Sequence, residues 1–225
     1  MDQFTQAERA TDWRGNNNIA ESMYAQMRQE RHPCPAWIVA SAGTGGTLAT
    51  IGRFVAYRRH PTRVCGVDAE HSVFFDHYLS RDPDLRLDRG SRIEGIGRPR
   101  VEASFIPGVL DAMIQVPDRW SLAAMHSLSA RLGRPVGGST GTNLVAALAC
   151  AQDLADRGQG GSVGTLLCDD GQRYRHSYFD DAWLRANDLE CAAERAAFDA
   201  LIDRGEWPAA LRSAWRAAGD LAPAA

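Results

Sequence analysis

The chain has 225 residues, of which 44% are hydrophobic and 24% are charged, a composition typical of a folded globular protein. Its formal net charge of −3 excludes a general attraction to nucleic acid or anionic membranes, and no apolar run approaches the ~20 residues that a membrane span needs. The five cysteines include no CxxC pair, which predicts reduced, buried thiols and a cytoplasmic location. The six histidines form no HxH or HExxH motif, so no metal site is predicted.

The first part of the chain predicts a helix, a strand and a second helix in that order. Residues 16–32 begin with asparagines suited to capping a helix and repeat apolar side chains at helical spacing. Residues 36–41 form a short apolar run entered through prolines, which is typical of a buried parallel strand. Thr47 then begins a run with Leu48, Ile51 and Phe54 on one helical face.

The following residues continue this alternation. Residues 63–70 predict a second strand, and residues 81–108 predict a long loop rich in glycine, proline and charge, a length that usually indicates function. Residues 118–132 predict a helix ended by Gly133, and residues 134–141 a turn. Another helix, over 142–157, ends at Gly158, and residues 162–171 predict a third strand ending in two aspartates.

The tail, residues 183–225, is rich in alanine and arginine and helical in pattern. A stripe of apolar residues there predicts a helix docked on its own domain, with a partner-binding helix as the alternative; its members are Leu189, Ala193, Ala197 and Leu201. Strand and helix alternation predicts an α/β fold with a parallel sheet and helices on both faces. We therefore divide the chain into an α/β domain, residues 1–185, and a helical extension, residues 186–225.

The stretch SAGTGGT, Ser41 to Thr47, connects the first predicted strand to the helix after it. Gly43, Gly45 and Gly46 permit positive φ and leave no Cβ between backbone and ligand. Their N–H groups can converge at the N-terminus of the next helix, where the helix dipole favours an anion. A phosphate group fits this description, and a tight turn without a ligand is the alternative.

The rest of the sequence narrows the kind of phosphate ligand. All 25 basic residues are arginine, so the lysine of a P-loop is missing. A Rossmann fingerprint needs glycine or alanine where Leu48 stands, although Asp68 lies where a ribose-binding acid is expected, which leaves a dinucleotide open. A phosphate monoester bound without magnesium fits best.

Four motifs, in a fixed order and including the glycine loop, resemble a known family. GTGGT after a buried strand is followed by EGIGRPRVEASFIP, VGGSTGTN and LLCDDGQRY, and DQF with NNNIAESM precedes them. This order resembles the cysteine synthase and cystathionine β-synthase family, which are pyridoxal-phosphate enzymes of the tryptophan synthase β fold type (fold type II). The resemblance covers residues 1–185, and its ending looks most like actinobacterial-type cysteine synthase-like and cysteine desulfhydrase members.

The resemblance implies roles for particular residues. The cofactor phosphate would be held by the backbone of Gly43, Thr44, Gly45, Gly46 and Thr47. The substrate pocket would be lined by Glu94, Gly95, Ile96 and Gly97, with Glu94 where the family usually has glutamine. Ser139 and Thr140 are expected to cap the next helix rather than contact the ligand.

Asp170 departs from the family pattern. It stands where the family places a serine hydroxyl against the pyridine nitrogen of the cofactor. A carboxylate there would favour the protonated nitrogen and strengthen the electron sink. Two solvated acids in a turn at a strand end are the alternative, and the resemblance favours Asp170 facing the cofactor.

The family also binds its cofactor through a Schiff base with a lysine, and this chain contains none. Arginine is no substitute, because it stays protonated in proteins. The resemblance therefore predicts an incomplete fold, the C-terminal portion of a cytoplasmic, homodimeric lyase or transferase of sulfur amino-acid metabolism. Its substrate would be a small amino acid such as cysteine or an activated serine. An inactive partner protein and a nucleotide-binding enzyme are the alternatives.

Overall fold

A computed structural model describes residue 7, residue 14 and residues 18–221 of the chain. The DQF stretch of the family resemblance, residues 2–4, lies outside the described residues. The described strands form one sheet in the order β4-β1-β2-β3-β5. They are β1 (Trp37–Ser41), β2 (Arg63–Ala69), β3 (Ala112–Val116), β4 (Val163–Thr165) and β5 (Arg216–Gly219). The β4-β1, β1-β2 and β2-β3 pairs are parallel, and β5 pairs antiparallel with β3.

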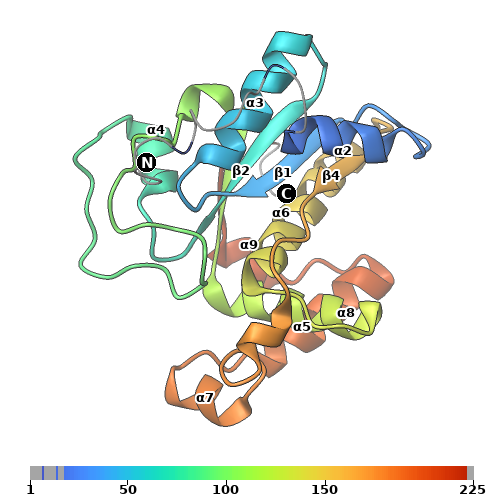
Figure 1. Cartoon of the computed structure of the whole chain (residues 1–225). Helices are drawn as coiled ribbons and strands as arrows, with labels where there is room; N and C mark the ends of the chain where they lie inside the picture. Colours follow the sequence, from blue (N-terminus) through green and yellow to red (C-terminus); the bar gives the residue numbers. More distant parts are fainter. Residues whose placement is uncertain (1–6, 8–13, 15–17, 222–225) are drawn as a thin grey trace.

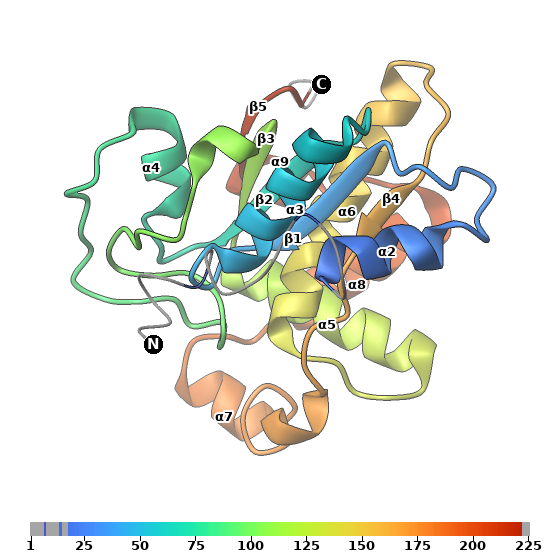
Figure 2. The same cartoon turned by 45° about the horizontal axis from the view of Figure 1, so that its top comes forward.

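Helices cover both faces of this sheet (Figures 1 and 2). One face carries α2 (Ile19–Met27), α3 (Gly46–Arg58) and α4 (Phe74–Ser80). The other carries α5 (Asp118–Leu132), α6 (Gly138–Asp156), α8 (Ala192–Arg204) and α9 (Ala209–Ala214). Beyond the sheet lie α7 (Asp181–Ala186) and two short 3-10 helices, η2 (Pro107–Val109) and η3 (Gly171–Tyr174). This arrangement confirms the predicted α/β fold.

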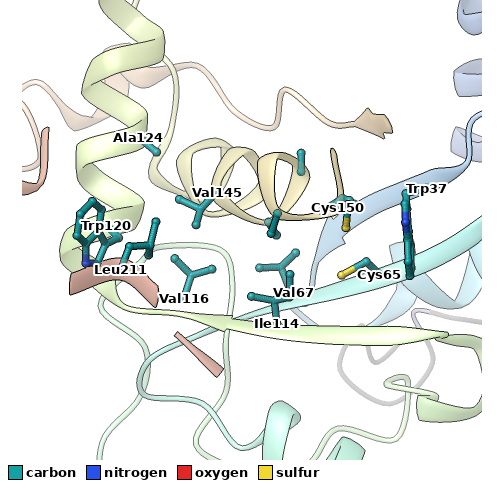
Figure 3. Packing of buried hydrophobic residues seen from close by; sticks show 14 of the residues in the cluster. Trp37, Cys65, Val67, Ile114, Val116, Trp120, Ala124, Val145, Cys150 and Leu211 are labelled. Carbon is teal, nitrogen blue, oxygen red and sulfur yellow. The ribbon is translucent and has the colours of Figure 1, made fainter. Parts of the chain in front are cut away.

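Alternate residues of the central strands build two cores. Val39, Cys65 and Ile114 face α5 and α6, while their strand neighbours Ile38 and Val64 face α3. All five are fully buried, as expected for strands covered on both sides. Figure 3 shows the α6 side of this packing.

Two of the cysteines meet in that core. The sulfurs of Cys65 and Cys150 point toward one another between β2 and α6 (Figure 3). The hydrogen bond with Cys150, and then burial, raises the pKa of the Cys65 thiol well above its usual value, so it stays protonated. Cys191 is buried as well, but Cys34 and Cys168 are exposed, so the expectation of buried thiols is wrong for these two.

The local signals at several element boundaries are confirmed. The Glu21 N–H donates to Asn18 Oδ1 at 2.9 Å, so Asn18 caps α2. The strand predicted over 36–41 is β1, and the helix predicted from Thr47 begins one residue earlier, at Gly46. Gly133 adopts φ of 65° directly after α5, the left-handed conformation that ends a helix.

Other elements differ from the sequence-based expectations. The turn predicted over 134–141 is wrong for its last four residues, because α6 already begins at Gly138. Close packing explains why two glycines enter this helix: a Cβ on Gly141 would lie 2.0 Å from the Ser121 carbonyl oxygen. Both α4 and β3 lie in stretches where no element was predicted.

The tail is only partly helical. Residues 216–219 form strand β5, so a fully helical tail is wrong there. Within the tail, α8 docks on the domain's own core, in which Phe198 and Leu201 are buried together with Trp120 of α5. A helix of the tail therefore docks on its own domain, but the predicted stripe is wrong for Leu189, which precedes α8, and for Ala193, which is exposed. The division of the chain at residue 185 stays a prediction, and the Phe198 variant discussed below addresses it.

Asp68, at the end of β2, predicts a pH dependence of stability. Burial raises its pKa to about 7, although the Ser72 hydroxyl and the N–H groups of Phe75 and Ala69 lower it. The unfolded pKa is about 3.9, so the stability that this group contributes is complete below pH ~4. As the pH rises from there through 7, that contribution is lost at about 1.4 kcal/mol for each pH unit.

Unfolding by urea between pH 4.5 and 7.5 measures this dependence. Asp68→Asn should flatten the decrease in the free energy of unfolding with rising pH, even if the amide is less stable overall. Equal slopes for the parent and Asp68→Asn would contradict the raised pKa.

In the described part of the chain, no helix combines the length and apolarity needed to cross a bilayer.

Candidate cofactor site

A cavity of about 360 Å³ opens where β1 and β4 end. Segments far apart in the sequence line it: Ser41, Gly43 to Thr47, Glu94 to Ile96, Arg98, Ser139, Leu166, Cys168 and Asp169. The carboxyl ends of parallel strands are where open α/β sheets bind ligands. Residues from all four motifs, GTGGT, EGIGRPRVEASFIP, VGGSTGTN and LLCDDGQRY, therefore meet in one place.

The glycine loop needs its glycines for close backbone contacts. Gly45 adopts φ of 92°, and a Cβ on it would lie 2.4 Å from Phe105 Cα. A Cβ on Gly43 would lie 2.4 Å from the Gly95 carbonyl oxygen. Gly46 and Thr47 form the first turn of α3, and the N–H groups of a first turn have no acceptor within their own helix. The loop thus presents backbone donors at the positive end of a helix.

The loop over 94–97 lies against the glycine loop. The Gly97 N–H donates to the Ala42 carbonyl oxygen at 2.7 Å, which holds the two loops together. Gly97 is not among the residues that line the cavity, whereas Glu94, Gly95 and Ile96 are. The Glu94 carboxylate is exposed and forms an ion pair with Arg173 at 3.2 Å.

The first turn of α6 forms another part of the wall. Its N-cap is Gly137, so the expectation that Ser139 and Thr140 cap this helix is wrong. Ser139 lines the cavity instead, and Thr140 Oγ1 accepts the Cys168 N–H at 2.9 Å. Although Cys168 is partly exposed to solvent, the protein around its sulfur removes enough hydration to raise the pKa of the thiol, which keeps it protonated at neutral pH. No local sequence signal marked Cys168, because its place depends on contacts with α6.

The two aspartates after β4 have different surroundings. Asp169 lines the cavity; its Oδ2 accepts the Tyr174 hydroxyl, while its buried Oδ1 has no hydrogen-bond partner among the described residues. Asp170 is exposed, and its Oδ1 accepts the Gln172 N–H at 2.9 Å, which caps η3. Asp169 thus lies on the cavity wall, whereas the residue predicted to contact the cofactor is Asp170. A cofactor contact by Asp170 stays a prediction.

The arrangement suits a small ligand with an anionic group at one end. The glycine loop offers N–H donors for that group, and a carboxylate lies on the same wall for a basic or protonated nitrogen. A volume of about 360 Å³ lies within the usual range for small-molecule sites.

Comparison with known proteins identifies a matching family model and several similar proteins. The family model described as "Pyridoxal-phosphate dependent enzyme" matches residues 2–169. The L-cysteine desulfhydrase Cds1 of Mycobacterium tuberculosis is 59% identical over 197 residues, covering 88% of this chain and 54% of the relative. Cysteine synthase 2 of Schizosaccharomyces pombe is 30% identical, covering 67% of this chain and 40% of the relative. Cystathionine beta-synthase of Rattus norvegicus is 32% identical, covering 65% and 25%.

A solved structure shares the fold. The crystal structure of O-ureido-L-serine synthase superposes with a TM-score of 0.56 at 23% identity, covering 74% of this chain and 51% of that chain. The chain spans about half the length of the first of these curated relatives, and about half of this structure.

Proposed function

Since the chain belongs to the family of pyridoxal-phosphate dependent enzymes, we propose that its cavity forms the phosphate-binding and ring-facing part of an active site for sulfur amino acids. The observation that carries this proposal is the meeting of Gly43–Thr47, Glu94–Ile96 and Asp169 around one cavity. These segments are tens of residues apart in the sequence, and the fold brings them together at the carboxyl ends of the strands.

The residues present fit pyridoxal phosphate. At Gly43, Gly45 and Gly46 the backbone of the loop has no Cβ between it and a ligand, and the side chains of the loop are the hydroxyl-bearing Thr44 and Thr47. When bound, pyridoxal phosphate supplies an electron sink for negative charge that develops at the substrate Cα. The backbone N–H groups of Gly43–Thr47 would bind the phosphate and so fix the orientation of the cofactor.

The other residues would act on the ring and the substrate. A carboxylate of the CDD stretch, Asp170 by family position or Asp169 by its place on the wall, would hold a proton at the pyridine nitrogen. Glu94, Gly95 and Ile96 would contact the amino-acid substrate, and Gly97 would brace their loop through Ala42.

The relatives support a reaction class. The relative with 59% identity is named an L-cysteine desulfhydrase, and the others are named a cysteine synthase and a cystathionine beta-synthase. We therefore propose β-elimination from cysteine. Sulfide leaves Cβ, and hydrolysis of the remaining three-carbon product gives pyruvate and ammonia. β-Replacement by a sulfur nucleophile is the alternative. A cytoplasmic homodimer, as the family resemblance implies, completes the proposal.

The composition limits what these 225 residues do by themselves. They contain no lysine, so a lysine that binds the cofactor has to come from outside them. Purified with pyridoxal phosphate, the chain should show no visible absorbance of a protein-bound Schiff base beyond slow reaction at its N-terminal amine, whose pKa is near 8. It should release no sulfide from cysteine above the rate of free cofactor.

The matched experiment adds the part of the Mycobacterium tuberculosis relative that this chain does not cover. We expect that addition to restore both signals, provided that binding offsets several kcal/mol of association entropy. Efficient sulfide release by the chain alone would contradict the lysine-dependent reaction. The mixture could also bind the cofactor, with inorganic phosphate competing for that binding, and yet release no sulfide. That result would favour an inactive binding protein.

A further inference from the structure

A second group of polar residues lies at the same end of the sheet, where β2 and β3 end. Glu70 and His71 directly follow β2, and Asp118 begins α5 directly after β3. The register pairs Ala69 with Val116, so the residues that follow these two strands are neighbours. One ligand atom from each of the three side chains lies within 4.8 Å of the others.

Asp118 is the unusual member of this group. Its exposed fraction is 1%, and both of its carboxylate oxygens are buried without a hydrogen-bond partner among the described residues. A buried carboxylate without a partner is costly, because burial removes its hydration. Its backbone is satisfied, since the Asp118 N–H donates to Glu70 Oε2 at 3.1 Å. The unpartnered oxygens therefore belong to a side chain that faces another carboxylate and an imidazole.

Neighbouring arginines do not satisfy it directly. Arg89 and Arg92 act electrostatically on both Asp118 and His71. Among the described residues, neither arginine forms an ion pair with Asp118 or Glu70 within 4.0 Å. Two carboxylates and one imidazole thus remain in reach of one another, with Glu70 exposed, His71 half-buried and Asp118 buried.

We propose that Glu70, His71 and Asp118 bind a divalent first-row transition-metal ion such as zinc. Carboxylate and imidazole ligands suit such ions, and three protein ligands leave a position for water. The ion would neutralise the buried charge of Asp118 and tie the ends of β2 and β3 to the start of α5. The sequence predicted no metal site because these ligands form no spaced motif. The proposal stands independently of the cofactor site.

Cobalt(II) is the probe, because its visible absorption reports the ligands. Titration of the chain should give one saturable absorption that zinc displaces, with no near-ultraviolet band from cysteine thiolate. Asp118→Asn, Glu70→Gln and His71→Gln should each weaken cobalt binding more than the tenfold to hundredfold that loss of an outer-shell partner costs. Cobalt should also raise the melting temperature of the parent and not that of Asp118→Asn.

Matched controls carry the same changes elsewhere on the surface. Glu30→Gln and His176→Gln alter exposed residues and should leave the cobalt affinity unchanged. If Asp118→Asn fails to fold, Glu70→Gln and His71→Gln still test the site, because neither residue is fully buried. Equal affinity of the parent and these variants, a thiolate band, or no binding at millimolar cobalt would overturn the proposal.

Discussion

Replacing Gly45 with alanine is expected to lower the free energy of unfolding by about 3 kcal/mol or more and to abolish phosphate binding at the cavity. A φ of 92° is strained for any residue with a side chain, which costs about 1–3 kcal/mol. The new Cβ would also lie 2.4 Å from Phe105 Cα and 2.6 Å from the Ser104 carbonyl oxygen. Because both are backbone atoms, relief requires a shift of the loop, and overpacking adds about 1–3 kcal/mol.

Two glycines separate these contributions. Gly133 also has positive φ, but a Cβ at that position would meet no other atom within 4 Å, so Gly133→Ala should cost only about 1–2 kcal/mol. Gly108 has space and ordinary φ, so Gly108→Ala should be neutral. Urea unfolding measures stability, and competition of inorganic phosphate with pyridoxal phosphate measures the site. Wild-type stability and phosphate binding in Gly45→Ala would show that the loop is not held as described.

Phe198→Ala should lower the free energy of unfolding by about 3–5 kcal/mol, the usual cost of removing a buried aromatic ring. Phe198 lies on α8 in the described tail, and its side chain is fully buried in the core beside α5. The expected result is a single unfolding transition shifted to lower urea, because the tail and the sheet share this core. Fluorescence and circular dichroism should report the same shift.

The control for this variant removes an apolar side chain at the surface. Leu79 is 54% exposed, so Leu79→Ala should change stability by no more than about 0.5 kcal/mol. Two separate transitions in Phe198→Ala, with the sheet unchanged, would instead support residues 186–225 as an independent extension.

Elements with strong local signals were predictable from the sequence. The β1 strand, the glycine loop and α3 follow one another with proline, glycine and apolar spacing that identify each element. Two strands carried weaker signals. β3 has Gln115 within its short apolar run, and the structure accommodates it because Gln115 Nε2 donates to the Ala69 carbonyl oxygen at 3.2 Å.

The β5 sequence, Arg-Ala-Ala-Gly, has no preference for a strand. It forms one because β3 offers an unpaired edge, which only the tertiary structure supplies. The candidate site divides in the same way. The motifs predicted which loops meet, but the choice between Asp169 and Asp170 depends on the turn into η3, where a shift of one residue exchanges wall and cap.

The late position of β5 has a consequence for biosynthesis. Val116 completes β3, but the strand that covers its edge begins at Arg216, about a hundred residues later. At roughly 5–20 residues per second, a ribosome needs on the order of 5–20 s to make the intervening segment. For that interval the nascent chain carries an open strand edge beside a hydrophobic core that still lacks Phe198, Leu201 and Leu211, the kind of surface that chaperones bind and that promotes aggregation when translation stalls.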